Sequence, residues 1–248
     1  MRRRGAASRA LTAAGLALLV AAAAALALLA EPYVAGRDGR DFARFEDASA
    51  AEDGFPDIDW DALMAENPDT VGWVKVEGTP IDYPIVRASE GDPQRYLSHD
   101  FYGNENVYGC PYLASGCASL LEGSAIVYGH NMLDGSMFSS FEKYLDQGFF
   151  DEHREVLVMT PERNARMRAV AARAVSAYDE GPAIGIEGRQ EVGRYLRDAY
   201  SRADAAGDPP QPAAGVVTFV CCSASRENGR ALVYAVESGP SSDPLSAP

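Results

Sequence analysis

Three residues have side chains suited to nucleophilic catalysis, and each stands at the edge of an apolar, strand-like run. Cys222 ends the run 216–222, and a cysteine at a strand end beside a polar loop can be exposed enough to act as a nucleophile. His130 closely follows the run 124–128, and an imidazole suits the role of a general acid or base. Arg230 begins the run 230–237, where its charge needs an anionic partner or an anion to stabilise.

Each candidate also has an ordinary structural interpretation. Free cysteine is among the most buried residue types, so Cys222 could belong to the core. His130 could be a loop histidine without a function, and Arg230 could be a surface residue of a strand. His99 and His153 lie in polar surroundings and are assigned no role. The chain order His, Cys, Arg argues against a papain-like protease, in which the cysteine comes first.

The elements that must position these residues are short and mostly extended. Apolar patterns predict eight strands, at 71–76, 81–86, 107–113, 124–128, 156–159, 165–178, 216–222 and 230–237. A short capped helix is predicted between residues 57 and 67, and helical spacing predicts two more at 137–145 and 187–200. Strands and helices do not alternate regularly. We therefore expect a mostly antiparallel barrel or sandwich decorated by helices.

The beginning of the chain predicts a membrane anchor. Arg2, Arg3, Arg4 and Arg9 precede an uncharged run of 21 residues, 10–30. A helix of that length spans about 30 Å, which matches the hydrocarbon core of a bilayer. The arginines favour a cytoplasmic segment 1–9, so the chain from residue 31 onward is expected outside the cell. A cleaved signal peptide is the alternative, because Ala25-Leu26-Ala27 resembles a cleavage site.

Composition divides the remaining chain and excludes some classes of protein. Residues 31–57 are rich in Asp, Ala, Gly and Glu and predict a flexible stalk, whereas 238–248 is a Ser/Pro-rich tail. Residues 58–237 are left as one globular domain. The formal charge of −14 argues against nucleic-acid binding, which depends on Lys and Arg. The four cysteines have no Cys-x-x-Cys spacing, so no metal site is expected.

Longer stretches of sequence around the candidates carry a family resemblance. The most specific is Ile126-Val127-Tyr128-Gly129-His130-Asn131-Met132, followed by Asp134-Gly135-Ser136-Met137-Phe138. Segments 59–74, 78–86 and 96–103 continue it, and 150–212 has the length of a helix-bearing insertion before the cysteine strand. With the predicted anchor, these segments resemble the sortases, specifically class B, over about residues 58–237. The family's cysteine motif is Thr-Leu-x-Thr-Cys, whereas here it reads Thr218-Phe219-Val220-Cys221-Cys222.

The resemblance implies a fold class and a role for each candidate. The fold would be mostly β: an eight-stranded sortase-type barrel with an N-terminal helix, an inserted helix before the cysteine strand, and a preceding transmembrane helix. Cys222 would be the nucleophile, His130 the general acid and base, and Arg230 the group that stabilises the oxyanion or holds the peptide. Neighbouring residues on a strand face opposite ways, so only one of Cys221 and Cys222 can meet His130 and Arg230. The position of Thr218 favours Cys222.

The resemblance also implies partners and a place of action. The enzyme would cleave a C-terminal sorting signal of a secreted protein and join the acyl product to an amine of a peptidoglycan precursor or of a pilin. It would need no metal or organic cofactor, and it would act outside the cell, held in the cell membrane. Two alternatives stay open: a non-catalytic interaction module with this fold, and a hydrolase that releases the peptide to water.

Cys110 and Cys117 raise a separate question. They are six residues apart across a possible turn at Ala114-Ser115-Gly116. If the anchor is correct they lie outside the cell, where disulfides persist. A disulfide between them would spare the thiols of Cys221 and Cys222. Two small buried thiols are the alternative, and the family resemblance does not demand the bond.

Overall fold

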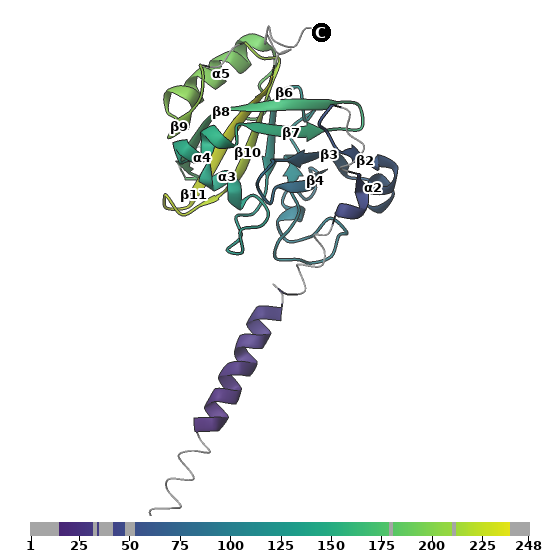
Figure 1. The fold of residues 1–248 in the computed structure, drawn as a ribbon, viewed down its shortest axis with the longest axis vertical. Coiled ribbons are helices and arrows are strands. Elements are labelled where there is room, and N and C mark those ends of the chain that lie inside the picture. The colour runs from purple at the N-terminus through teal and green to yellow at the C-terminus, as the bar shows by residue number, and fades with distance from the viewer. Residues whose placement is uncertain are drawn as a thin grey trace, which may run out of the picture.

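The computed structural model describes residues 15–31, 34, 42–47, 53–178, 181–209 and 212–238 (Figure 1). Residues 15–31 are helical. The elements that follow are η1 (Ala43–Phe45), β1 (Glu46–Asp47), β2 (Asp57–Ile58), α2 (Trp60–Glu66), β3 (Thr70–Lys75), β4 (Asp82–Arg87), η2 (Arg95–Leu97), β5 (Tyr112–Leu113), β6 (Gly123–Tyr128), α3 (Ser139–Lys143), α4 (Gln147–Glu152), β7 (Glu155–Met159), β8 (Asn164–Ser176), α5 (Arg189–Ser201), β9 (Ala205–Ala206), β10 (Gly215–Ser223) and β11 (Gly229–Glu237).

Eight of these strands close into a barrel. They run in the order β11-β10-β6-β5-β4-β3-β7-β8, and the pairing of β11 with β8 closes the ring, while β9 pairs with β8 outside it. Neighbours in this sheet are antiparallel except for β6 with β10 and β4 with β5, which are parallel. The predicted eight-stranded barrel is confirmed. The N-terminal helix is present as α2, and the inserted helix before the cysteine strand is present as α5.

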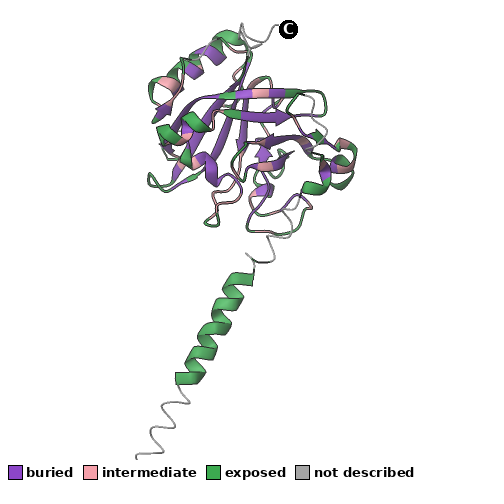
Figure 2. Ribbon diagram, viewed as in Figure 1, coloured by how far each residue is buried: buried purple, intermediate pink, exposed green. Residues whose placement is uncertain are grey.

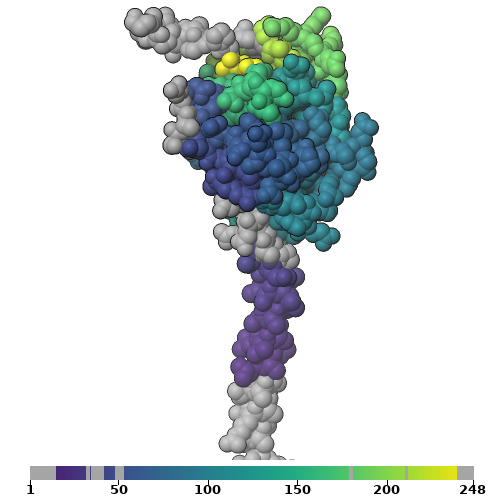
Figure 3. All heavy atoms as spheres, turned by 90° about the vertical axis from the view of Figure 1, so that its right-hand side faces the viewer, coloured from purple at the N-terminus to yellow at the C-terminus, as the bar shows by residue number. Residues whose placement is uncertain are grey.

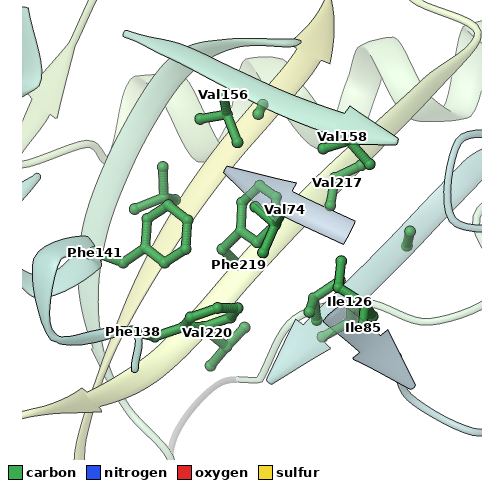
Figure 4. Packing of buried hydrophobic residues seen from close by; sticks show 14 of the residues in the cluster. Val74, Ile85, Ile126, Phe138, Phe141, Val156, Val158, Val217, Phe219 and Val220 are labelled. Carbon is green, nitrogen blue, oxygen red and sulfur yellow. The ribbon is translucent and has the colours of Figure 1, made fainter. Parts of the chain in front are cut away.

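Strand β10 is apolar along most of its length because both of its faces are covered (Figure 2). Helix α3 packs against one face, where the Phe219 ring stacks on Phe141 with centroids 4.6 Å apart and Phe138 meets Phe219 edge-on at 6.0 Å (Figure 4). Helix α5 covers the other face, where its Tyr195 meets Tyr234 of β11 at 5.6 Å. Because it is packed from both sides, β10 is a rigid base for the residues at its end.

The domain begins earlier than the predicted boundary at residue 58. Residues 42–47, expected in the stalk, pack on the barrel, and Phe42 and Phe45 are only 7% and 4% exposed. The Phe42 ring meets Trp73 edge-on at 6.2 Å, and Lys75 of β3 forms ion pairs with both Glu46 and Asp82. The N-terminal part of the domain, in dark blue, lies on the face turned to the viewer in Figure 3. Two aromatic residues in a polar segment have no periodicity, so the pattern could not reveal this packing.

The strand predicted at 107–113 is much shorter, since only Tyr112 and Leu113 form β5. The chain before it is occupied by a turn: Gly109 has φ +60 and donates its N–H to the carbonyl of Asn106 at 3.1 Å. Pro111 has no N–H to offer a neighbouring strand. The helix predicted at 137–145 is confirmed in part as α3, whereas α4 was not predicted.

The predicted transmembrane segment 10–30 overlaps the described helix at 15–31, while residues 10–14 lie outside the described residues. Within the part of the chain that the structure describes, no helix is both long enough and apolar enough to cross a membrane. The predicted cytoplasmic segment 1–9 and, apart from Ser238, the predicted tail also lie outside the described residues.

Candidate active site

Cys222 is exposed near the C-terminal end of β10, whereas Cys221 beside it is buried and only 2% exposed. The two thiols therefore differ as strand alternation predicts. Burial raises the pKa of the Cys221 thiol far above its ordinary value, and the nearby Glu142 carboxylate raises it further. A thiol that stays protonated and is enclosed by protein cannot be the nucleophile, because the thiolate is the reactive form. Of the two, only Cys222 is accessible to a substrate.

Arg230 lies directly across from Cys222, because these two residues are partners in the antiparallel pairing of β10 with β11. Side chains of such partners lie on the same face of the sheet, with Cβ atoms about 4.5–5.5 Å apart. The guanidinium Nη1 donates to the Gly229 carbonyl at 2.8 Å and to the Asn228 carbonyl and side-chain oxygens, each at 3.3 Å. Among the described residues Arg230 forms no ion pair, so its charge remains available to an anion.

His130 reaches the same place through the parallel pairing of β6 with β10. Val220 is the partner of Tyr128, and the Gly129 N–H donates to the Val220 carbonyl at 3.0 Å. His130 and Cys222 each come two residues after that last pair, so the two segments run on side by side. The imidazole Nε2 lies 2.7 Å from the Leu97 carbonyl oxygen. A carbonyl oxygen only accepts hydrogen bonds, so Nε2 carries the ring proton. Nδ1 is therefore the nitrogen that can take up and release a proton during the reaction.

The position of the His130 ring depends on two glycines that sequence reasoning did not single out. A Cβ on Gly109 would lie 2.3 Å from the Tyr96 carbonyl oxygen and 3.3 Å from Cδ2 of His130. A Cβ on Gly129 would lie 2.6 Å from the Phe138 ring. The positive φ of Gly109 is the structural reason for a glycine at that position. A glycine inside the predicted strand 107–113 was the available signal, since glycine there often marks a close backbone approach.

These side chains open into one groove of about 520 Å³. Its lining includes His130, Cys222 and Arg230 together with mainly apolar and aromatic side chains such as Tyr112, Tyr128 and Ile184. Arg230 is the one permanently charged side chain in the described lining. An extended, mostly uncharged peptide segment fits such a groove. Within the described residues, no group of three or more His, Cys, Asp or Glu side chains is arranged to hold a metal ion.

The remaining histidines and cysteines lie elsewhere. His99 is half-buried and its Nδ1 lies 3.0 Å from the Arg95 carbonyl, while the His153 ring stacks on Phe149 at 4.0 Å. Cys110 and Cys117 are both buried as free thiols, so the disulfide considered between them is not formed. Burial raises the pKa of both thiols. Cys110 and Cys117 are thus two small buried thiols in the core, as in the alternative to the disulfide.

Comparison with curated proteins relates parts of this chain to sortase B. It is 39% identical over 93 residues to sortase B of Listeria monocytogenes, which covers 37% of each chain. It is 25% identical over 138 residues to sortase B of Staphylococcus aureus, covering 55% of this chain and 56% of that one. The chain thus matches between about a third and just over half of the length of these relatives. No family model matches the sequence.

Solved structures extend the likeness to most of the chain. Sortase B from Bacillus anthracis superposes with a TM-score of 0.69 at 24% identity, covering 84% of this chain and 99% of that one. A Staphylococcus aureus sortase B–substrate complex gives a TM-score of 0.65 at 23% identity, covering 74% of this chain and 86% of that one. Clostridium perfringens sortase B gives 0.65 at 24% identity, covering 72% and 99%. At these identities the superpositions show a shared fold.

Proposed function

We propose that this chain is a class B sortase that acts as a cysteine transpeptidase; its fold and the sequence segments it shares with sortase B support the proposal. The observation that carries the proposal is the convergence of three side chains, from β10, β11 and the end of β6, on one groove. Cys222 is the nucleophile, His130 the general acid and base, and Arg230 the donor to the oxyanion.

The reaction has two halves. In the first, the Cys222 thiolate attacks a peptide carbonyl in the groove, and the negative charge that develops on the carbonyl oxygen is stabilised by the Arg230 guanidinium. The carbon–sulfur bond forms and the carbon–nitrogen bond breaks. His130, which holds on Nδ1 the proton lost by the Cys222 thiol, gives that proton to the departing amine. In the second, an incoming amine attacks the thioester, His130 takes up the amine's proton, and the thiolate is released. The Leu97 carbonyl orients the ring throughout through its bond to Nε2.

The proposed acyl donor is the C-terminal sorting signal of a secreted protein, and the proposed acceptor is an amine of a peptidoglycan precursor or of a pilin. The lining of the groove, uncharged apart from Arg230 and His130, supports an extended peptide as the donor. An amine acceptor agrees with a site where the deprotonating group, His130, stands beside the nucleophile. The apolar groove also limits the competing attack by water.

We further propose that residues 10–30 anchor the protein in the cell membrane, with the N-terminal arginines inside and the catalytic domain outside. The uncharged run of 21 residues behind four arginines supports this placement. Fractionation of cells tests it. The full chain is expected in the membrane fraction, and a chain lacking residues 1–30 is expected outside that fraction. Recovery of the full chain from the soluble fraction would contradict the anchor.

The activity is tested with the full chain in detergent, a panel of candidate sorting peptides and a panel of amines, with products identified by mass spectrometry. Cys222→Ala is expected to abolish both the thioacyl adduct and amine transfer. Cys221→Ala is the matched control and is expected to keep a substantial fraction of the rate, because that side chain is buried. An adduct found on Cys221, or release of the peptide to water at the same rate with and without amine, would overturn the proposal.

A further inference from the structure

A carboxylate from α3 lies between the segment that carries His130 and the segment that carries Cys222. Oε2 of Glu142 accepts a hydrogen bond from Nδ2 of Asn131 at 2.5 Å, and its Oε1 accepts one from the main-chain N–H of Ala224 at 2.8 Å. Asn131 directly follows His130, and Ala224 comes two residues after Cys222. One side chain therefore binds both segments at once.

The amide of Asn131 adds a second link. Its Nδ2 also donates to the main-chain carbonyl of Cys222 itself, at 2.9 Å. A side-chain amide nitrogen has two protons, so the two bonds use both of them. The residue beside the proposed general acid and base is thus joined directly to the backbone of the proposed nucleophile.

These side-chain bonds begin where the main-chain pairing stops. Within the described residues, the main-chain bonds between the β6 and β10 segments end with the Gly129 N–H and the Val220 carbonyl. Beyond that bond, the chain from His130 leaves the sheet, whereas Cys222 and Ser223 stay paired with β11 alone. Glu142 can hold them because its helix is fixed to β10 by the stack of Phe141 on Phe219.

We propose that Asn131 and Glu142 are positioning residues that hold Cys222 in the orientation toward His130 that acyl transfer requires. The proposal rests on the transpeptidase function proposed above. Neither residue is among those that line the groove, so we expect neither to bind the peptide. Their effect is therefore expected on the rate of the chemical step rather than on peptide binding.

The charge of Glu142 strengthens the arrangement. Burial by itself raises the pKa of a carboxyl, but hydrogen bonds from the Ser223 hydroxyl, the Ala224 N–H and Asn131 outweigh it and lower the pKa of Glu142 below its ordinary value. At neutral pH the group is ionised, and its hydrogen bonds are charge-assisted and stronger than neutral ones. On the neighbouring strand β10, the negative charge of Glu142 raises the pKa of the buried Cys221 thiol.

Exchanging the amide of Asn131 and the carboxylate of Glu142 tests whether these two side chains position Cys222. Asn131→Asp removes the donor to Cys222 and places a second carboxylate against Glu142, so kcat for transfer is expected to fall by about tenfold to a hundredfold with KM for the peptide unchanged. Adding Glu142→Gln to that variant supplies an N–H from position 142 to the new carboxylate. The double variant keeps an oxygen for Ala224 and is expected to recover the part of kcat that the repulsion between the two carboxylates removed, but not the part that the lost bond to the Cys222 carbonyl removed.

Glu152→Gln is the matched control, because it removes an equal charge from an exposed position on the neighbouring helix α4. It is expected to leave kcat and KM unchanged. A double variant no faster than Asn131→Asp alone would overturn the positioning role, and so would wild-type kcat in Asn131→Asp. A fall in kcat for Glu152→Gln equal to that for Asn131→Asp would overturn it as well.

A second measurement does not depend on catalysis. The amide resonance of Ala224, followed by NMR as the pH is lowered, is expected to shift with the titration of Glu142 in the wild type and to lose that shift in Glu142→Gln. If Ala224 titrates but no peptide and amine pair reacts, the transpeptidase function fails while the link between the segments stands. If Ala224 does not titrate, the link itself is refuted.

Discussion

Gly109→Ala is expected to slow the proposed transfer strongly, although it replaces none of the three proposed catalytic side chains. The added Cβ would lie 2.3 Å from the Tyr96 carbonyl oxygen and 3.2 Å from that of Leu97. Since real Cβ contacts stay beyond 3.0 Å, the Tyr96 oxygen and the new methyl group must separate by at least 0.7 Å. The positive φ of Gly109 adds about 1–2 kcal/mol for any residue with a Cβ.

The displacement cannot be absorbed at Tyr96 alone. Its carbonyl accepts the Cys110 N–H at 2.9 Å, and its hydroxyl donates to Asp69 at 2.7 Å. The shift therefore passes to η2 and to the Leu97 carbonyl, which holds Nε2 of His130 at 2.7 Å. A misplacement of about 1 Å can cost a hundredfold in rate. We expect kcat/KM for transfer to fall about a hundredfold and the free energy of unfolding to fall by at least about 1–2 kcal/mol.

The measurements are steady-state transfer kinetics and urea unfolding, with Gly188→Ala as the control. Gly188 has φ +78, and no atom lies within 4 Å of the position that a Cβ would take there, so alanine incurs the backbone cost without the clash. This control is expected to lose stability but to keep its rate. The reasoning is refuted if Gly109→Ala keeps the wild-type rate, or if Gly188→Ala loses as much activity as Gly109→Ala.

Three further outcomes are expected. Arg230→Lys should lower kcat by about a hundredfold to a thousandfold, as loss of an oxyanion donor does, because lysine lacks the planar fork; a near-wild-type rate would mean that charge alone suffices. Phe42→Ala should lower the free energy of unfolding by about 3–5 kcal/mol in urea, and unchanged stability would remove 42–47 from the core. Because folding lowers its pKa, Glu142 should stabilise the fold at a pH above its ordinary pKa of 4.5. This stabilisation should be lost as the pH falls through the lower pKa of the folded state. Melts of wild type and Glu142→Gln across acid pH check this, and a constant difference would contradict it.

Local pattern was sufficient for much of the fold. Strands at 71–76, 124–128, 156–159, 216–222 and 230–237 reappear as β3, β6, β7, β10 and β11, because alternating or continuous apolar runs are a property of neighbouring residues. The exposure of Cys222 and burial of Cys221 also follow from alternation along one strand. Family resemblance supplied the barrel, which local pattern left undecided between a barrel and a sandwich.

What the sequence determined by itself was therefore the identity of the candidate residues and the strands that carry them. Only the tertiary structure decided what holds them together: the Leu97 carbonyl on His130, the space at Gly109, and the Glu142 carboxylate between two segments. The bond of Leu97 to His130 joins residues 33 positions apart in the chain, and that of Glu142 to Ala224 joins residues 82 positions apart. Periodicity reports only near neighbours, whereas such contacts depend on strand register and packing, which the barrel establishes as a whole.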